Sequence, residues 1–181
     1  MLMRSLLLLS VTVLTACSQV APPFAASASF ADEKKGAEPK ELKPEPVTLT
    51  VPLDPDVPSK MAKAIGGKTP GSVELSLDGV KTPKGWKTRT AIRVFLNNPD
   101  ATANTSPKDP SFVFAFHLSA QDGDESQNIG IDLGPTLALQ KWEPGQKVRV
   151  TFVLVPETGE ALPKDVKVPF EKCYISVPER P

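Results

Sequence analysis

Apolar and polar residues alternate along most of the chain after residue 46. Six runs carry an apolar residue at every second position: residues 47–53, 73–77, 92–96, 112–118, 148–154 and 173–177. A period of two is typical of strands that bury one face in a core. Turn residues such as Asp78-Gly79 and Pro144-Gly145 separate the runs. The pattern predicts an all-β fold, an antiparallel β-sandwich of about seven to eight strands.

Two segments depart from this alternation. Residues 59–65 fit one or two helical turns, with Ser59 as the N-cap and Gly66-Gly67 as the stop. Residues 136–142 fit either a helical turn or a short strand. We interpret both as structured connections, so that the sandwich carries one or two short helical turns.

The run at residues 112–118 is the richest in aromatic residues. Side chains on a strand alternate between its two faces, so Phe112, Phe114 and Phe116 share one face. We expect all three to point into the core, with Phe114 the most buried. His117 falls on the opposite face, and we expect it at the surface or at the rim.

The first 17 residues have the pattern of a bacterial secretion signal. Arg4 supplies one positive charge, an apolar run extends to Leu14, and Leu14-Thr15-Ala16-Cys17 resembles a lipobox. The run is too short for a membrane-spanning helix, which needs about 20 apolar residues. An ordinary secretion signal cut near residues 26–31 is the competing interpretation, but those sites lie well beyond the run. We therefore expect a lipoprotein signal peptide at residues 1–16.

In this interpretation Cys17 becomes the lipidated first residue of the mature protein. The protein then lies in the bacterial cell envelope and is held to a membrane by its lipid. Ser18 follows the cysteine in place of an aspartate that retains some lipoproteins at the inner membrane, which favours the outer membrane. If Cys17 carries lipid, Cys173 has no partner for an intrachain disulfide.

The segment after the signal has little to bury. Residues 18–45 are rich in Ala, Pro, Lys and Glu, and the whole chain has 20 prolines among 181 residues, about twice the usual share. This composition predicts a disordered tether at residues 17–45, anchored by lipid. The sandwich domain is then predicted to occupy residues 46–181.

The charge of the chain is balanced, with 21 basic and 21 acidic residues. Loss of Arg4 with the signal leaves 20 basic and 21 acidic residues, a net charge of −1. A protein that binds nucleic acid through phosphates needs a basic surface, so we exclude nucleic acid as a partner.

Residues suited to catalysis are few. The chain has one histidine, His117, which excludes a blue-copper site because that site needs two histidines and a cysteine. Cys173 alternates with Ile175 and Val177, which favours a small buried hydrophobe over a reactive thiol. We predict no catalytic residue, no metal ligand and no cofactor.

Two further groups have a structural and a functional interpretation. Asp122, Asp124 and Glu125 have oxygens that suit calcium, but their spacing matches no full calcium loop, which favours a solvated acidic turn. Trp86 and Trp142 can line a groove for sugar or peptide, although packing in the core or at its rim is the commoner role of tryptophan.

The order of the strand-like runs resembles the C-terminal domain of plant polyphenol oxidases and related tyrosinases. The residues that carry the resemblance are Ala91 to Asn97 (AIRVFLN), Asp109 to Phe116 (DPSFVFAF), Asn128 to Leu133 with Thr136-Leu137, Lys147 to Pro156, and Val166 to Val177. It covers roughly residues 71–178 and rests on the order and spacing of strands. In that family the domain is a β-sandwich that shields the copper site of the latent enzyme. The copper site itself uses six histidines, so this chain, with one, departs from the family there.

Two functions remain. The resemblance implies a non-catalytic module that docks on a secreted or periplasmic protein, such as a copper oxidase, through loops at residues 83–86 and 122–127. The alternative is a stand-alone envelope protein that binds sugar or peptide, which an exposed aromatic groove at Trp86 or Trp142 would favour. The first is our main hypothesis, and in both the protein is not an enzyme.

Overall fold

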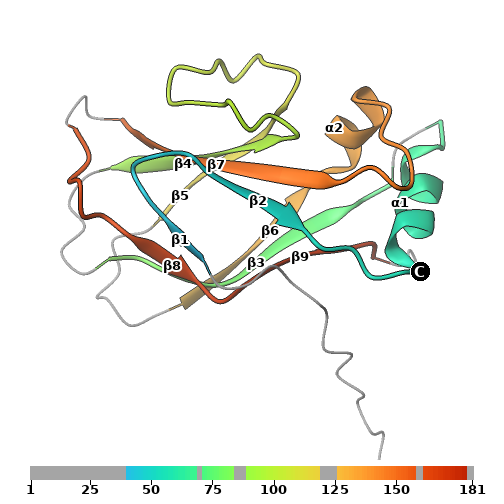
Figure 1. Ribbon diagram of the computed structural model, residues 1–181, viewed down its shortest axis with the longest axis horizontal. Helices are drawn as coiled ribbons and strands as arrows, with labels where there is room; N and C mark the ends of the chain where they lie inside the picture. The colour runs from blue at the N-terminus through green and yellow to red at the C-terminus, as the bar shows by residue number, and fades with distance from the viewer. Residues whose placement is uncertain (1–39, 69–70, 84–88, 119–125, 158–160, 179–181) are drawn as a thin grey trace, which may run out of the picture. The chain divides into compact units, whose positions relative to one another are not determined.

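Strands dominate the fold and form two packed main sheets and a small two-stranded sheet (Figure 1). The structure is a computed structural model that describes residues 40–68, 71–83, 89–118, 126–157 and 161–178. The strands are β1 (Lys40–Leu42), β2 (Val47–Val51), β3 (Glu74–Lys81), β4 (Thr90–Leu96), β5 (Phe112–His117), β6 (Ser126–Asp132), β7 (Val148–Pro156), β8 (Val168–Phe170) and β9 (Lys172–Ser176). The helices are α1 (Val57–Ile65) and α2 (Gly134–Leu139). The predicted all-β antiparallel sandwich is confirmed.

One sheet has four strands in the order β2-β7-β4-β5, and the other has three in the order β6-β3-β9. All of the pairings are antiparallel. The alternating residues face each other between the two sheets, and the main core includes Leu75, Val94, Phe152 and Cys173. β5 contacts β6 at one lateral side of the sandwich, and β2 contacts β9 at the other.

β1 and β8 form a small two-stranded sheet of their own. They precede β2 and β9 in the chain, pair with each other, and contact β7 and β3 respectively. Leu42, Val168 and Phe170 from this pair are almost fully buried in the main core. The pair therefore covers the lateral side at which β2 and β9 meet, and we call this the covered side.

The position of β1 corrects the predicted domain boundary. Residues 40–42 lie within the segment predicted to be a disordered tether, yet they form a strand in which Leu42 is 1% exposed. An exposed ion pair between Lys167 Nζ and Glu41 Oε2, at 2.9 Å, joins the strand to the residue before β8. The packed domain thus begins before residue 46, and the part of the predicted tether at residues 17–39 lies outside the described residues.

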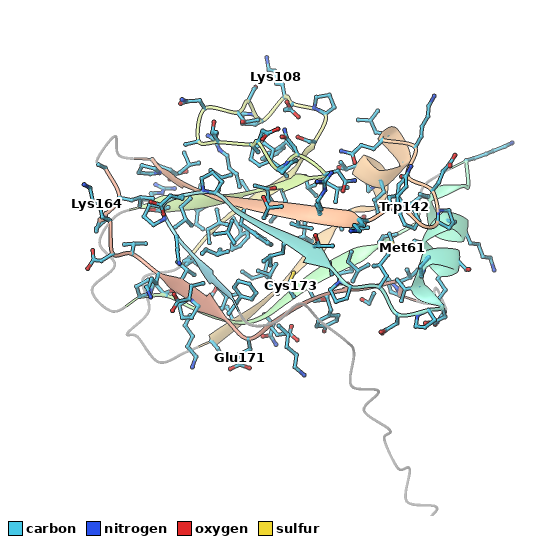
Figure 2. The ribbon with its side chains drawn as sticks, viewed as in Figure 1. Met61, Lys108, Trp142, Lys164, Glu171 and Cys173 are labelled. Atoms are coloured by element: carbon cyan, nitrogen blue, oxygen red, sulfur yellow. The ribbon has the colours of Figure 1, made fainter. Side chains whose placement is uncertain are left out.

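The central strands β4 and β7 are buried on both faces. Phe95, Val153 and Ala101 form a second, smaller core on the outer face of the four-stranded sheet, with Phe112 and Val155 against it. Residues 97–111, which connect β4 to β5, lie over this face in Figure 1, and Lys108 in this connection is labelled in Figure 2. The Arg93 guanidinium donates from Nη1 to the carbonyls of Ala103 and Thr105, which fastens the connection to the sheet.

The prediction that the three phenylalanines of β5 point into the core together is wrong for Phe112 and for Phe114. A bulge interrupts the pairing of β5 with β4: Val94 pairs with Phe114 and Phe95 with Phe112, so Val113 has no partner. Phe112 packs on the outer face against Phe95, with ring centroids 5.7 Å apart. Phe116 packs partly buried against the main core, while Phe114 is 44% exposed. The residue inserted at Val113 moves Phe112 to the outer face, which a period of two does not foresee. Phe114 pairs with Val94 on the same face as Phe116, and it is exposed because β5 is an edge strand within the described residues.

Both predicted connections contain a helix. α1 begins at Val57, with Asp56 as its N-cap and Pro58 in its first turn, rather than at Ser59. Proline suits the first turn because its missing N–H would have no partner inside the helix. α1 and α2 contact each other, and no helix within the described residues is long and apolar enough to cross a membrane.

Candidate functional site

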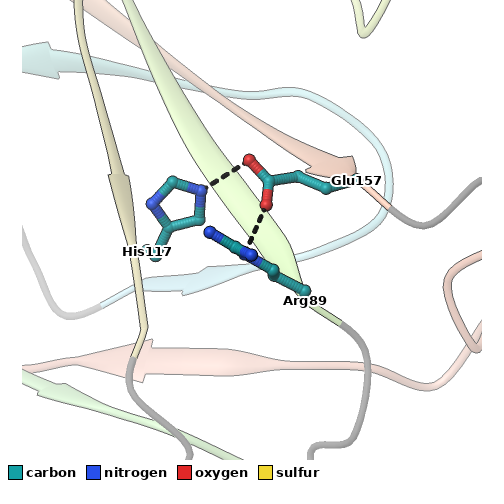
Figure 3. Close-up of polar contacts among 3 residues, drawn as sticks. All are labelled: Arg89, His117 and Glu157. Carbon is teal, nitrogen blue, oxygen red and sulfur yellow. Dashed lines mark hydrogen bonds and ion pairs between the residues drawn. The ribbon is translucent and has the colours of Figure 1, made fainter.

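The one histidine of the chain lies at the surface, as predicted, in a three-residue polar cluster (Figure 3). His117 Nε2 is 2.7 Å from Glu157 Oε1, and Arg89 Nε is 2.8 Å from Glu157 Oε2. The Glu157 N–H also donates to the Arg89 carbonyl at 2.9 Å. The cluster joins the end of edge strand β5 to the residue after β7 and to the residue before β4.

The charges of this cluster affect the pKa of Glu157. The hydrogen bond from His117 holds the pKa of the Glu157 carboxyl below its usual value, and the nearby charges of His117, Arg89 and Arg93 act in the same direction. The Arg89 side chain is 76% exposed and the His117 side chain 46% exposed, so water screens these contacts. The arrangement ties three segments together and offers no buried acid or base for catalysis.

Cys173 behaves as predicted. Its side chain is fully buried on β9, and burial together with the charge of Asp78 raises the pKa of its thiol to about 12. A thiol with such a pKa is not a nucleophile near neutral pH. Within the described residues, no group of three or more His, Cys, Asp or Glu side chains is placed to hold a metal ion.

Of the two tryptophans considered for a surface groove, the structure describes Trp142. Trp142 is 4% exposed and packs in the main core, so the expected burial is confirmed and the residue cannot line a surface groove. Its indole N–H has no hydrogen-bond partner in the described structure. Figure 2 labels Trp142, which follows α2 in the chain. Trp86 lies outside the described residues, as do Cys17, Asp122, Asp124 and Glu125.

Asn97 directly follows β4 and is the last residue of the segment 91–97, one of those that carry the family resemblance. It has a left-handed backbone, with φ of 55°, which asparagine tolerates better than most residues. Its side chain donates to Gln140 Oε1 at 2.9 Å and accepts from the Arg149 N–H at 3.0 Å. These bonds tie the end of β4 to β7 and to the residue after α2, so the role of Asn97 is structural.

The lateral side formed by β5 and β6 differs from the covered side, and we call it the open side. Within the described residues β5 pairs with β4 alone and β6 with β3 alone. Phe114 on β5 is exposed at this side. Among the described residues the other exposed large hydrophobic side chain is Leu139, on α2. The connection between β5 and β6 includes most of the predicted docking loop at residues 122–127, of which Ser126 and Gln127 are described.

Sequence reasoning missed two features of these surfaces. The alternation predicts Phe114 in the core, and its exposure follows from the edge position of β5, which one segment of sequence does not display. Glu157 was not singled out at all, since it lies 40 residues from His117 along the chain. A charged residue just after the long apolar run of β7 was the available signal, because it marks the end of a buried strand.

No protein-family model and no curated protein matches the chain. Among solved structures, a recombinant latent aurone synthase, described as a polyphenol oxidase, is similar at 19% identity and a TM-score of 0.48, covering 78% of this chain and 26% of that chain. Latent apple tyrosinase is similar at 16% identity and a TM-score of 0.48, covering 82% of this chain and 30% of that chain. The chain thus spans less than a third of either oxidase, and the similarity concerns the fold.

Proposed function

We propose that the chain is a non-catalytic lipoprotein of the cell envelope whose sandwich docks on a separate secreted protein. The observation that carries this proposal is the exposure of Phe114 on β5, which within the described residues pairs with β4 alone. A large aromatic side chain left in water on an otherwise well-packed domain is the kind of residue that anchors protein interfaces. The preferred partner is a helical copper oxidase, because residues 71–178 resemble the sandwich that shields the copper site in that family.

The non-catalytic part of the proposal rests on composition. Oxidation of phenols by a paired copper site needs six histidines, and this chain has one. His117 is already bonded to Glu157 at the surface. The sandwich therefore supplies no copper ligands to the partner, and we propose that it changes the partner's activity by covering or releasing its active site.

The test uses the mature chain with Cys17→Ser, which removes the lipid, and a tyrosinase-type oxidase encoded beside it. We expect saturable binding, a change in the oxidase's turnover of a diphenol, and loss of both in Phe114→Ser. Robust turnover of the diphenol by the lipoprotein alone with copper would overturn the non-catalytic assignment. No binding to the oxidase would put the sugar- or peptide-binding alternative first.

The anchor has its own test. Cys17→Ala in the full chain should block lipid attachment and move the protein out of the membrane fraction. A variant that is still processed normally and stays in the membrane fraction would contradict lipidation at Cys17.

A further inference from the structure

The four outer edges of the two main sheets are protected to different degrees. β2 is bounded by Pro46 and Pro52, β9 carries Lys172, and β6 ends in Asp132. Prolines and charges on edge strands prevent pairing with other chains. β5, with the sequence FVFAFH, has no proline, lysine, arginine, aspartate or glutamate. Its bulge at Val113 lies near its start and leaves residues 114–116 as a regular edge without proline or charge.

The outer edge of β5 has backbone groups with which another strand could form hydrogen bonds. The backbone N–H and C=O groups that β5 turns away from β4 have no strand partner within the described residues. A strand placed there would satisfy these groups and would also cover the ring of Phe114. The edge is therefore suited to strand addition, in which backbone bonds give affinity and alternate side chains give specificity.

A second copy of β5 meets these requirements. Two identical strands can pair antiparallel across a two-fold axis without repulsion, because the segment 112–116 carries no charge. If the axis passes beside Phe114, the two Phe114 rings face each other. If it passes beside Ala115, each Phe114 faces Phe116 of the other copy, and both exposed rings are covered at once.

Anchoring would bring the copies together. The predicted anchor at Cys17 is separated from β1 by the 22 residues from 18 to 39. In a proline-rich extended form, such a segment reaches about 70 Å. Two anchored domains on one membrane would thus be within reach of each other at a high effective concentration. This step rests on the proposed function, whereas the strand pairing itself does not.

We propose that two copies of this chain pair antiparallel through β5, and that the pair occupies the open side until a partner protein displaces it. Self-association then regulates docking, because both assemblies use Phe114. The protein without its partner is a dimer, and partner binding requires its dissociation.

The test measures oligomeric state by sedimentation of the mature Cys17→Ser chain over a range of concentrations. We expect a reversible dimer whose dissociation constant rises at least tenfold in Phe114→Lys, which puts two like charges at the contact. Phe114→Leu should retain the dimer. Thr50→Lys, at an exposed position on the other edge of the same sheet, is the matched control and should leave the dimer unchanged. Thermal unfolding of each monomer would show that the variants remain folded.

A wild-type chain that is monomeric at every concentration would overturn the proposal, and so would a dimer that Thr50→Lys weakens as much as Phe114→Lys. Adding the copper oxidase separates this inference from the proposed function. A monomer that binds the oxidase through Phe114 would leave the function standing and reject self-association. A dimer that Phe114→Lys disrupts and that no oxidase dissociates would support strand pairing and reject regulated docking on the oxidase.

Discussion

The two lateral sides of the sandwich differ in how their edge strands are covered. On the covered side, β1 and β8 bring Leu42, Val168 and Phe170 into the core and leave no large apolar side chain exposed among them. On the open side, β5 and β6 have no such cover within the described residues, and Phe114 remains 44% exposed. The covered side therefore contributes apolar burial to stability, whereas the open side leaves an aromatic side chain exposed, as the proposed docking requires.

The largest effect is expected for Phe170→Ala on the covered side. Phe170 is 3% exposed and its ring lies 6.5 Å from that of Phe152. Removing a buried aromatic ring should lower the free energy of unfolding by about 3–5 kcal/mol. Phe114→Ala, the same change on the open side, should cost about 1 kcal/mol or less. Chemical denaturation of both variants checks this, and equal losses would contradict the distinction between the two sides.

The next largest loss of stability is expected for a substitution in β1, which tests whether this strand belongs to the domain. Leu42→Ala should lower the free energy of unfolding by about 2–4 kcal/mol, because the leucine is 1% exposed in the main core. Glu41→Gln on the same strand removes an exposed ion pair and should change stability little. Denaturation curves for the two variants decide the matter. A neutral Leu42→Ala would restore the predicted boundary at residue 46.

A smaller loss is expected at Cys173 on β9. Cys173→Ser puts a hydroxyl into an apolar, fully buried position and should cost about 1–3 kcal/mol. Ser126→Ala, at an exposed position on β6, should be close to neutral. In the Cys17→Ser chain, the Cys173 thiol should also resist alkylation until the protein unfolds. Rapid labelling under native conditions would show that the covered side opens more readily than its burial indicates.

The smallest effect is a pH dependence at the open side. The pKa of Glu157 is lowered in the folded protein from its ordinary value of 4.5, chiefly by the hydrogen bond from His117. The charged carboxylate is therefore favoured by folding above pH 4.5, and this contribution is lost as the pH falls through the folded pKa. Glu157→Gln should reduce the loss of thermal stability between about pH 5 and about pH 3. Identical pH profiles for variant and wild type would show that the cluster contributes nothing measurable.

Much of the sandwich could be predicted because its information is local. Alternation at residues 47–53, 73–77 and 148–154 identified β2, β3 and β7, and the same periodicity placed Cys173 in the core. The exposure of His117 followed from its position between apolar neighbours on one strand. These features depend on a period of two within a single segment, which a sequence displays directly.

The remaining features depend on residues far apart in the chain. β1 has three residues, two of them charged, so it shows no periodicity, and its place is set by pairing with β8 more than 120 residues later. The position of Phe112 on the outer face depends on the bulge opposite β4, and the exposure of Phe114 depends on β5 being the last strand of its sheet within the described residues. Neither strand order nor the position of a bulge can be read from the alternation of one segment.

The position of β1 also has a mechanical consequence. Any pull on the chain before Lys40 reaches the domain first through β1, whose three residue pairs with β8 bear the load before any other strand does. Resistance to that pull depends on Leu42 and on this short ladder, and not on the free energy of unfolding of the whole sandwich. Two variants of equal thermodynamic stability can therefore yield at different forces, according to whether the substitution lies in β1 or in the central strands.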